Sequence, residues 1–139
     1  MKLNGHLIHY GSNPSQNYNY AVSAIDRHLD EGRPIMVGVN HTIGNTINEK
    51  TTDHLVVITG RDYDSSNGQY YYTYIETGRY ASQAAAACDT NNNRFYYDPN
   101  TLSLTDDSVL KHDKGYTVTQ VRPNDGIITN TVSQYKSCQ

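Results

Sequence analysis

The segment 51–79, TTDHLVVITGRDYDSSNGQYYYTYIETGR, decides the fold class of this chain. It holds two short runs rich in β-branched and aromatic residues, which is the composition typical of strands. Between the runs lies an Asn-Gly pair, a dipeptide typical of a tight hairpin turn. We therefore predict two antiparallel strands, at 54–60 and 69–76, joined by a turn over 61–68.

One helix precedes this hairpin. In the segment 19–32, NYAVSAIDRHLDEG, apolar residues recur at helical spacing, with Asn19 as N-cap and Gly32 just past the last turn. The other predicted elements are an irregular lead-in over 1–19, strands at 34–39, 94–98 and 116–122, a polar loop over 40–53, a short Ala-rich helical turn within 77–93, and a polar tail over 123–139.

One helix followed by a meandering run of strands predicts a single α+β domain over 1–139, with the helix packed on an antiparallel sheet of about five strands. The net charge is −3 and no run of Lys or Arg occurs, so we expect no nucleic-acid partner. No segment has the ~18 apolar residues of a membrane span. The first residues lack the apolar stretch of a signal peptide.

The two cysteines, Cys88 and Cys138, lie far apart in the chain and have no zinc-type spacing. We expect separate thiols, with a single disulfide as the alternative. His6 and His9 form a His-x-x-His pair without a third ligand. The sequence therefore predicts no metal site and no cofactor.

His54 and Glu76 stand at the same end of the two central strands. With a turn centred near Ser65 they lie directly opposite, on one face, with Cβ atoms about 5 Å apart. A carboxylate on one imidazole nitrogen fixes the tautomer and makes the other nitrogen a better base. The alternative is an exposed ion pair worth ~0–1 kcal/mol. A register slip of one residue would separate the two side chains.

Three neighbours are candidates for the rim of such a site. Asn40 and His41 follow the predicted strand 34–39, and Asn40 is a candidate oxyanion donor. Asp53 precedes the candidate base, but adjacent residues of a strand point to opposite faces, so capping of the loop is the competing role. The tyrosines of 69–76 are expected to pack in the sheet, with substrate stacking as the alternative.

Three motifs together resemble bacterial papain-like cysteine peptidases and amidases: GRPIMVGVNH (32–41), TTDHLVVITGRDYD (51–64) and GQYYYTYIETG (68–78). The resemblance covers 21–78. It implies a papain-like fold in which His54 is the general base and Glu76 orients it. In that family a cysteine at the start of an N-terminal helix is the nucleophile.

No cysteine precedes His54, and the upstream serines Ser12, Ser15 and Ser23 do not occupy the start of the predicted helix. Three explanations stay open. The chain is the C-terminal portion of a larger papain-like domain, with the nucleophile on a missing N-terminal segment. It is an inactive relative that binds. Or Cys88 is the nucleophile, as in circularly permuted relatives.

The resemblance implies a cysteine hydrolase that acts on a peptide or on peptidoglycan, as a secreted or delivered antibacterial effector. The alternative function is a catalytically inactive binding module that recognises a peptide, a glycan or an immunity protein.

Overall fold

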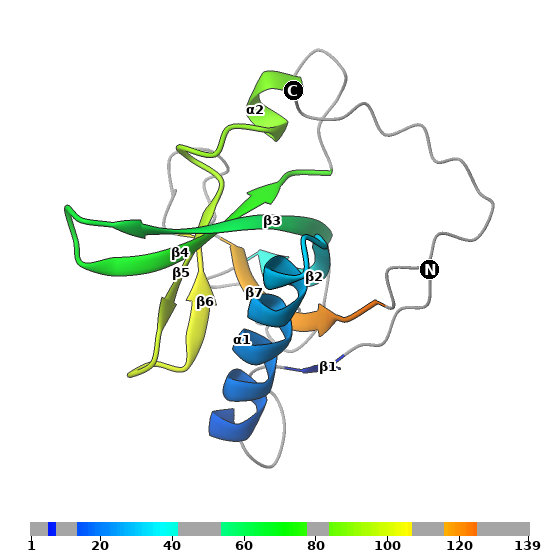
Figure 1. Ribbon diagram of the computed structural model, residues 1–139, viewed down its shortest axis with the longest axis vertical. Coiled ribbons are helices and arrows are strands. Elements are labelled where there is room, and N and C mark those ends of the chain that lie inside the picture. The colour runs from blue at the N-terminus through cyan, green and yellow to red at the C-terminus, as the bar shows by residue number, and fades with distance from the viewer. Residues whose placement is uncertain (1–5, 8–13, 42–53, 78–83, 107–115, 125–139) are drawn as a thin grey trace.

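The structure is a computed structural model that describes residues 6–7, 14–41, 54–77, 84–106 and 116–124 (Figure 1). Its helices are α1 (Pro14–Asp30) and α2 (Ala84–Ala87). Its strands are β1 (His6–Leu7), β2 (Ile35–His41), β3 (His54–Asp64), β4 (Gln69–Ile75), β5 (Arg94–Asp98), β6 (Ser103–Thr105) and β7 (Tyr116–Arg122).

The strands form one antiparallel sheet that closes on itself. Its order is β1-β7-β2-β3-β4-β5-β6, and β6 also pairs with β7 through Thr105 and Thr117. The six strands from β7 round to β6 therefore make a barrel. The short β1 pairs with the same edge of β7 as β6 does, but further along the strand, where His6 pairs with Val121. Closure leaves few unpaired strand edges in this part of the chain.

The predicted α+β papain-like fold, with the helix packed on an antiparallel sheet of about five strands, is therefore wrong, because six strands close into a barrel. The five predicted strands are present as β2, β3, β4, β5 and β7. The strand that closes the barrel, β6, has 3 residues and was not predicted, because so short a run carries no alternating pattern. The Ala-rich helical turn is present as α2. Part of the predicted lead-in is helical, because α1 begins at Pro14 and not at Asn19. Proline suits the first turn of a helix, where its missing N–H has no partner to lose.

The barrel interior is filled by side chains from alternate strand positions. Its rings are stacked, with Tyr74 and Phe95 centroids 4.3 Å apart and Tyr72 and Tyr97 centroids 5.0 Å apart. Large aromatic rings bury much apolar surface each, so they supply a large share of the stabilisation. The other buried interior residues include Ile35, Val37, Val39, Val56, Ile58, Leu104, Val118 and Val121.

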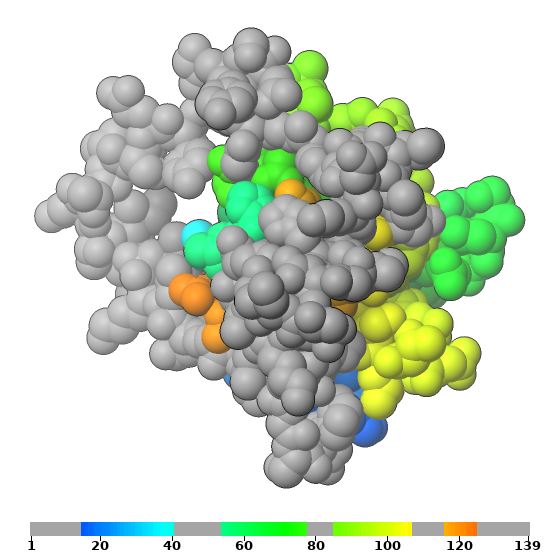
Figure 2. All heavy atoms as spheres, turned by 180° about the vertical axis from the view of Figure 1, so that it is seen from behind, coloured from blue at the N-terminus to red at the C-terminus, as the bar shows by residue number. Residues whose placement is uncertain are grey.

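Helix α1 packs on the barrel with one apolar face, on which Ala21, Ala24 and Ile25 are buried. Its Asp26 ties it to the hairpin of β3 and β4: Oδ1 accepts a hydrogen bond from the Tyr72 hydroxyl at 2.7 Å and pairs with Arg61 at 2.9 Å. Seen from behind, that hairpin (green) and the hairpin of β5 and β6 (yellow) project on one side of the molecule (Figure 2). Within the described ranges no helix has the length and apolar character needed to cross a membrane.

Gly32 ends helix α1, as the sequence predicts. Its φ of 72° lies in the left-handed region, and Arg33 N–H donates to the His28 carbonyl at 2.8 Å. This is the Schellman ending that glycine favours. The imidazole of His28 is buried, and its Nε2 accepts the Asn124 N–H at 3.0 Å. His28 is thus a satisfied structural histidine. The tail beyond Asn124 lies outside the described residues.

Burial raises the pKa of Tyr18 from 10.0 to about 12, with nearby Tyr97 and Asp98 adding to the shift. A folded state that holds this proton more tightly loses stability as the pH rises from 10 towards 12, and has that stability in full below pH 10. The free energy of unfolding, measured by denaturant titration at pH 10 and at pH 12, should fall by about 2–3 kcal/mol less in Tyr18→Phe than in the unmutated protein. Tyr20→Phe, on the exposed side of the same helix, is the matched control; equal alkaline losses in both variants would contradict the assignment.

Candidate functional site

His54 and Glu76 lie in contact at the end of the β3–β4 hairpin that is remote from its turn. His54 opens β3, and Glu76 directly follows β4. The imidazole Nε2 and the carboxylate Oε1 are joined by a hydrogen bond that is also an ion pair when the imidazole is protonated. The Glu76 side chain is 3% exposed and that of His54 is 21% exposed. The carboxylate is therefore buried while the imidazole can still be reached from outside.

The register that produces this contact depends on one extra residue in β3. On the turn side Gly60 pairs with Thr73, whereas on the far side Ile58 pairs with Tyr74. Thr59 has no partner of its own in this ladder, which is a β-bulge. A bulge of one residue exchanges the two faces of the strand beyond it.

The bulge places His54 and Glu76 on the same face. Beyond it Val57 pairs with Ile75, so Val56 lies opposite Glu76 and His54 is a diagonal neighbour of that carboxylate. Were the turn-side pairing to continue without the bulge, Glu76 would lie on the face opposite to His54. The predicted contact is therefore present, but the predicted direct opposition about Ser65 is wrong.

Tyr116, the first residue of β7, completes this group. Its hydroxyl donates to Oε2 of Glu76 at 2.7 Å, and its ring centroid lies 5.6 Å from that of the His54 imidazole. Both oxygens of the buried carboxylate thus have a partner, as a buried charge requires. A carboxylate held in this way fixes the orientation and tautomer of the imidazole that it contacts.

A second buried carboxylate, that of Asp106, belongs to a residue linked to Glu76 through Tyr116. Asp106 accepts a hydrogen bond from the Tyr74 hydroxyl, and its N–H donates to the Tyr116 carbonyl at 2.8 Å. Burial, followed by the charge of Asp106 and this hydrogen bond, raises the pKa of Tyr74, with Glu76 adding to the shift. Tyr74 therefore stays protonated and serves as a donor.

The sequence analysis did not single out Tyr116 or Asp106 for this site, and it considered Tyr74 only as a tyrosine on the His54 face that packs in the sheet or stacks on a substrate. Tyr116 opens β7 and Asp106 follows β6. Closure of the barrel brings Tyr116 to Glu76 and Asp106 to Tyr74. No pattern within a short stretch of sequence predicts a contact between strands that meet only on closure. The one usable signal was Tyr74, which by alternation shares the face of Glu76.

The proposed rim residues are not assembled around His54. Val39 pairs directly with His54, so alternation turns the buried Asn40 to the other face of β2. The backbone of His41 pairs with Tyr116. The side chain of His41 and all of Asp53 lie outside what the structure describes.

Cys88 follows α2, and α2 lies beside the end of β4, where Glu76 N–H donates to the Ala87 carbonyl at 2.9 Å. Cys88 is disulfide-bonded, so the expectation of separate thiols is wrong. A sulfur in a disulfide has no thiol to ionise and is not a nucleophile of the cysteine-peptidase kind. Cys138 lies outside the described residues.

The upstream serines are not brought to His54 either. Ser15 lies in the first turn of α1, so the prediction that it stands outside the start of the helix is wrong, and Ser23 lies further along the same helix. Both are exposed, while Ser12 lies outside the described residues. Helix α1 meets β3 at Arg61, through Asp26. Arg61 is seven positions from His54, which is roughly 20 Å along a strand.

Within the described residues no group of three or more His, Cys, Asp or Glu side chains is placed to hold a metal ion. Comparisons with models of protein families, with curated protein sequences and with solved structures give no match. The resemblance to bacterial cysteine peptidases thus stays a prediction from the sequence. The site itself is defined by its geometry as a buried carboxylate that holds an accessible imidazole.

Tyr116→Phe removes the hydroxyl that Glu76 accepts while keeping the ring beside His54. We expect a loss of about 1–3 kcal/mol in the free energy of unfolding, because a buried carboxylate oxygen is left without its donor. We also expect a changed imidazole ¹⁵N spectrum of His54. Tyr63→Phe, at an exposed tyrosine, is the control. A loss no larger than that of the control would contradict the assigned network.

Cys88 offers a direct test of the disulfide. We expect iodoacetamide to leave Cys88 unmodified in the folded, unreduced protein and to label it fully after reduction and denaturation, as read by peptide mass spectrometry. Fast labelling of Cys88 without reductant would contradict the structure and return this residue to the candidates for nucleophile.

Proposed function

We propose that this chain carries the general-base part of a hydrolase that acts by acyl transfer. The observation that supports the proposal is the network in which the buried Glu76 binds His54 at one oxygen and Tyr116 at the other. A surface ion pair needs neither the burial nor the second donor. An imidazole oriented in this way is the arrangement that nucleophilic catalysis uses.

The chemistry assigned to each residue follows from its position. His54 takes a proton from the attacking nucleophile and delivers it to the leaving amine. Glu76 stabilises the imidazolium that forms between these steps. Tyr116 is a positioning residue, because it touches the carboxylate and not the reacting atoms. Its hydroxyl keeps Glu76 from rotating away from the imidazole.

The nucleophile in this proposal is a thiol supplied from outside the described residues. Cys88 is excluded while it remains in its disulfide, and Ser15 and Ser23 lie on α1. Of the three explanations that the sequence leaves open, this proposal takes the one in which the nucleophile lies on another segment. We propose a peptide or peptidoglycan amide as substrate, and a secreted or delivered bacterial effector as the setting, on the resemblance alone.

The disulfide at Cys88 favours one alternative, a catalytically inactive module. In that case the accessible face of His54 binds a peptide, a glycan or an immunity protein, and the buried network only stabilises the barrel. The two functions differ in one measurable way: only the hydrolase needs the imidazole to exchange a proton.

The intact protein provides the test. We expect His54→Ala to abolish cleavage of peptidoglycan-derived muropeptides, detected by chromatography and mass spectrometry. Glu76→Gln should lower the rate by about 10²- to 10⁴-fold, the contribution typical of a correctly oriented acid–base group. Asp62→Asn, which changes an exposed carboxylate on the same strand, is the matched control and should leave the rate unchanged.

Cleavage that persists in folded His54→Ala would end the hydrolase proposal. Absence of cleavage in the unmutated intact protein, together with muropeptide binding that His54→Ala weakens, would favour the binding module. Circular dichroism of each variant separates loss of the group from loss of the fold.

A further inference from the structure

The disulfide of Cys88 lies next to a backbone contact of the candidate site. The Glu76 N–H donates to the carbonyl of Ala87 at 2.9 Å, and Cys88 is the residue that follows Ala87. The carboxylate of this same Glu76 binds the imidazole of His54. A change in the position of Ala87 is therefore passed to the residue that orients the imidazole.

Helix α2, which ends at Ala87, is poorly held by its own structure. It has 4 residues, all of them alanine. Helices shorter than about 12–15 residues are marginal in water unless other parts of the protein hold them. Alanine side chains bury little apolar surface, and Ala85 and Ala86 are exposed. The position of the Ala87 carbonyl therefore depends on the anchors at the end of the helix.

Asn93 and the disulfide are the two anchors described at this end of α2. The Asn93 side chain is buried, and its Nδ2 donates to the carbonyls of Ala86 and Ala87 at 3.0 Å each. The Asn93 carbonyl accepts the Tyr74 N–H at 3.0 Å, so this anchor is part of the sheet. Cys88 supplies the second, covalent anchor. Only this second anchor can be broken and remade by a chemical reaction, and Cys88 is half-buried, so a small reductant can approach it.

We propose that the disulfide of Cys88 is a redox-sensitive lock on the contact between Glu76 and His54. A dithiol opens it: one thiolate attacks a sulfur of the disulfide, and the second thiolate resolves the mixed disulfide. Both cysteine sulfurs become thiols with the two protons of the dithiol, which is itself oxidised to a disulfide. With this anchor gone, α2 leaves the end of β4 more often, so Glu76 loses its backbone partner and holds the imidazole less firmly. This inference rests on the function proposed for His54, in which the oxidised protein is then the active form.

The competing role for this disulfide is to stabilise the fold as a whole by restricting the unfolded chain. The two roles differ in which amide protons exchange faster after reduction. Loss of overall stability speeds exchange throughout the barrel core, whereas release of the lock acts first on the Glu76 amide. Hydrogen exchange measured residue by residue therefore separates the two roles.

Amide hydrogen exchange of the full chain, followed by ¹H–¹⁵N NMR with and without dithiothreitol, tests the proposal. Sucrose, which favours the folded state, is present in both samples. We expect reduction to speed exchange of the Glu76 amide by about tenfold or more relative to that of the buried Val56. We also expect it to change the imidazole ¹⁵N spectrum of His54, because the carboxylate that orients the ring is held less firmly.

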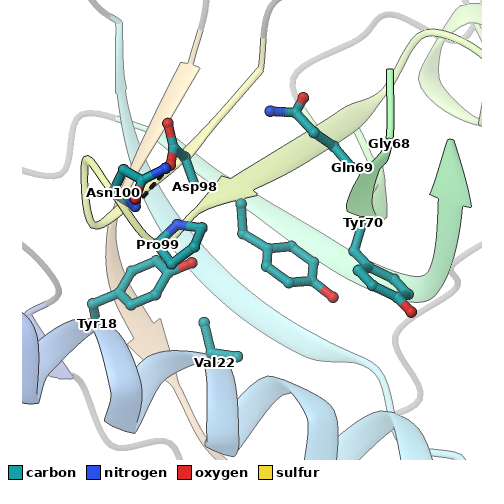
Figure 3. Close-up of a pocket in the computed structure, with 9 residues that line it drawn as sticks. Tyr18, Val22, Gly68, Gln69, Tyr70, Asp98, Pro99 and Asn100 are labelled. Carbon is teal, nitrogen blue, oxygen red and sulfur yellow. Dashed lines mark hydrogen bonds between the residues drawn. The ribbon is translucent and has the colours of Figure 1, made fainter. Parts of the chain in front are cut away.

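Two controls accompany this test. At the other end of β4, Tyr70 lines a cleft beside α1 (Figure 3). It is roughly 20 Å along the strand from Glu76, so its amide signal should not move on reduction. In the oxidised protein, Asn93→Ala should also speed exchange at Glu76, because it removes the other anchor. Asn92→Ala, at an exposed neighbour whose side chain binds an aspartate of the same turn, should leave that exchange unchanged.

The proposal is overturned by equal acceleration at Glu76 and Val56, by no acceleration at either, by an unchanged His54 spectrum, or by a reduced protein that unfolds even in sucrose. Each of these outcomes would leave the disulfide as a stabiliser of the whole fold or as a bond without effect on the site. None of these readouts requires turnover, so the muropeptide assay judges the proposed function separately. Where that assay detects cleavage, Cys88→Ser, which removes the disulfide without a reductant, should lower its rate.

Discussion

One extra residue, Thr59, determines which side chains of β3 share the barrel interior with those of β4. A strand alternates its side chains between two faces, so a single insertion exchanges them. Gly60 follows at the bulge, where a Cβ atom would lie 2.8 Å from the hydroxyl oxygen of Thr73. A side chain at this position would force Thr73 aside. The bulge, which the glycine at position 60 makes possible, therefore puts Val56 and Ile58 in the barrel interior and His54 on the same face as Glu76.

The site also depends on closure of the barrel. Glu76 is buried, and a buried carboxylate without hydrogen bonds is costly. One of its donors opens β3 and the other opens β7, strands that are distant in sequence. Asp106, after β6, holds the backbone of Tyr116 in place. The orientation of the imidazole is thus a consequence of the whole closed sheet and not of the hairpin alone.

The sequence could predict those features that depend on local patterns. The β3–β4 hairpin and the Gly32 helix ending both follow from residues near one another in the chain. The closed barrel could not be predicted, because the strand that closes it has 3 residues. Tyr116 was missed for the same reason, since only closure brings it to Glu76. The disulfide of Cys88 was only the alternative prediction, because two cysteines far apart in the chain carry no signal that the fold brings them together.

The errors in register offset one another. The predicted turn was centred too early, and the bulge was not foreseen. Together these two deviations shift the pairing of β3 with β4 beyond the bulge by an even number of residues, so His54 and Glu76 stay on one face. This explains why the predicted contact is present in a fold that differs from the predicted one. The face that a residue occupies depends on whether the shift is odd or even and not on its size.

Cross-strand NMR contacts between β3 and β4 test this central claim most directly. With the bulge at Thr59, backbone nuclear Overhauser effects should pair Gly60 with Thr73 and Ile58 with Tyr74. Contacts that pair Ile58 with Ile75 would mean that the turn-side register continues unbroken. Glu76 would then lie on the face away from His54, and both the site and the function proposed for it would have to be abandoned.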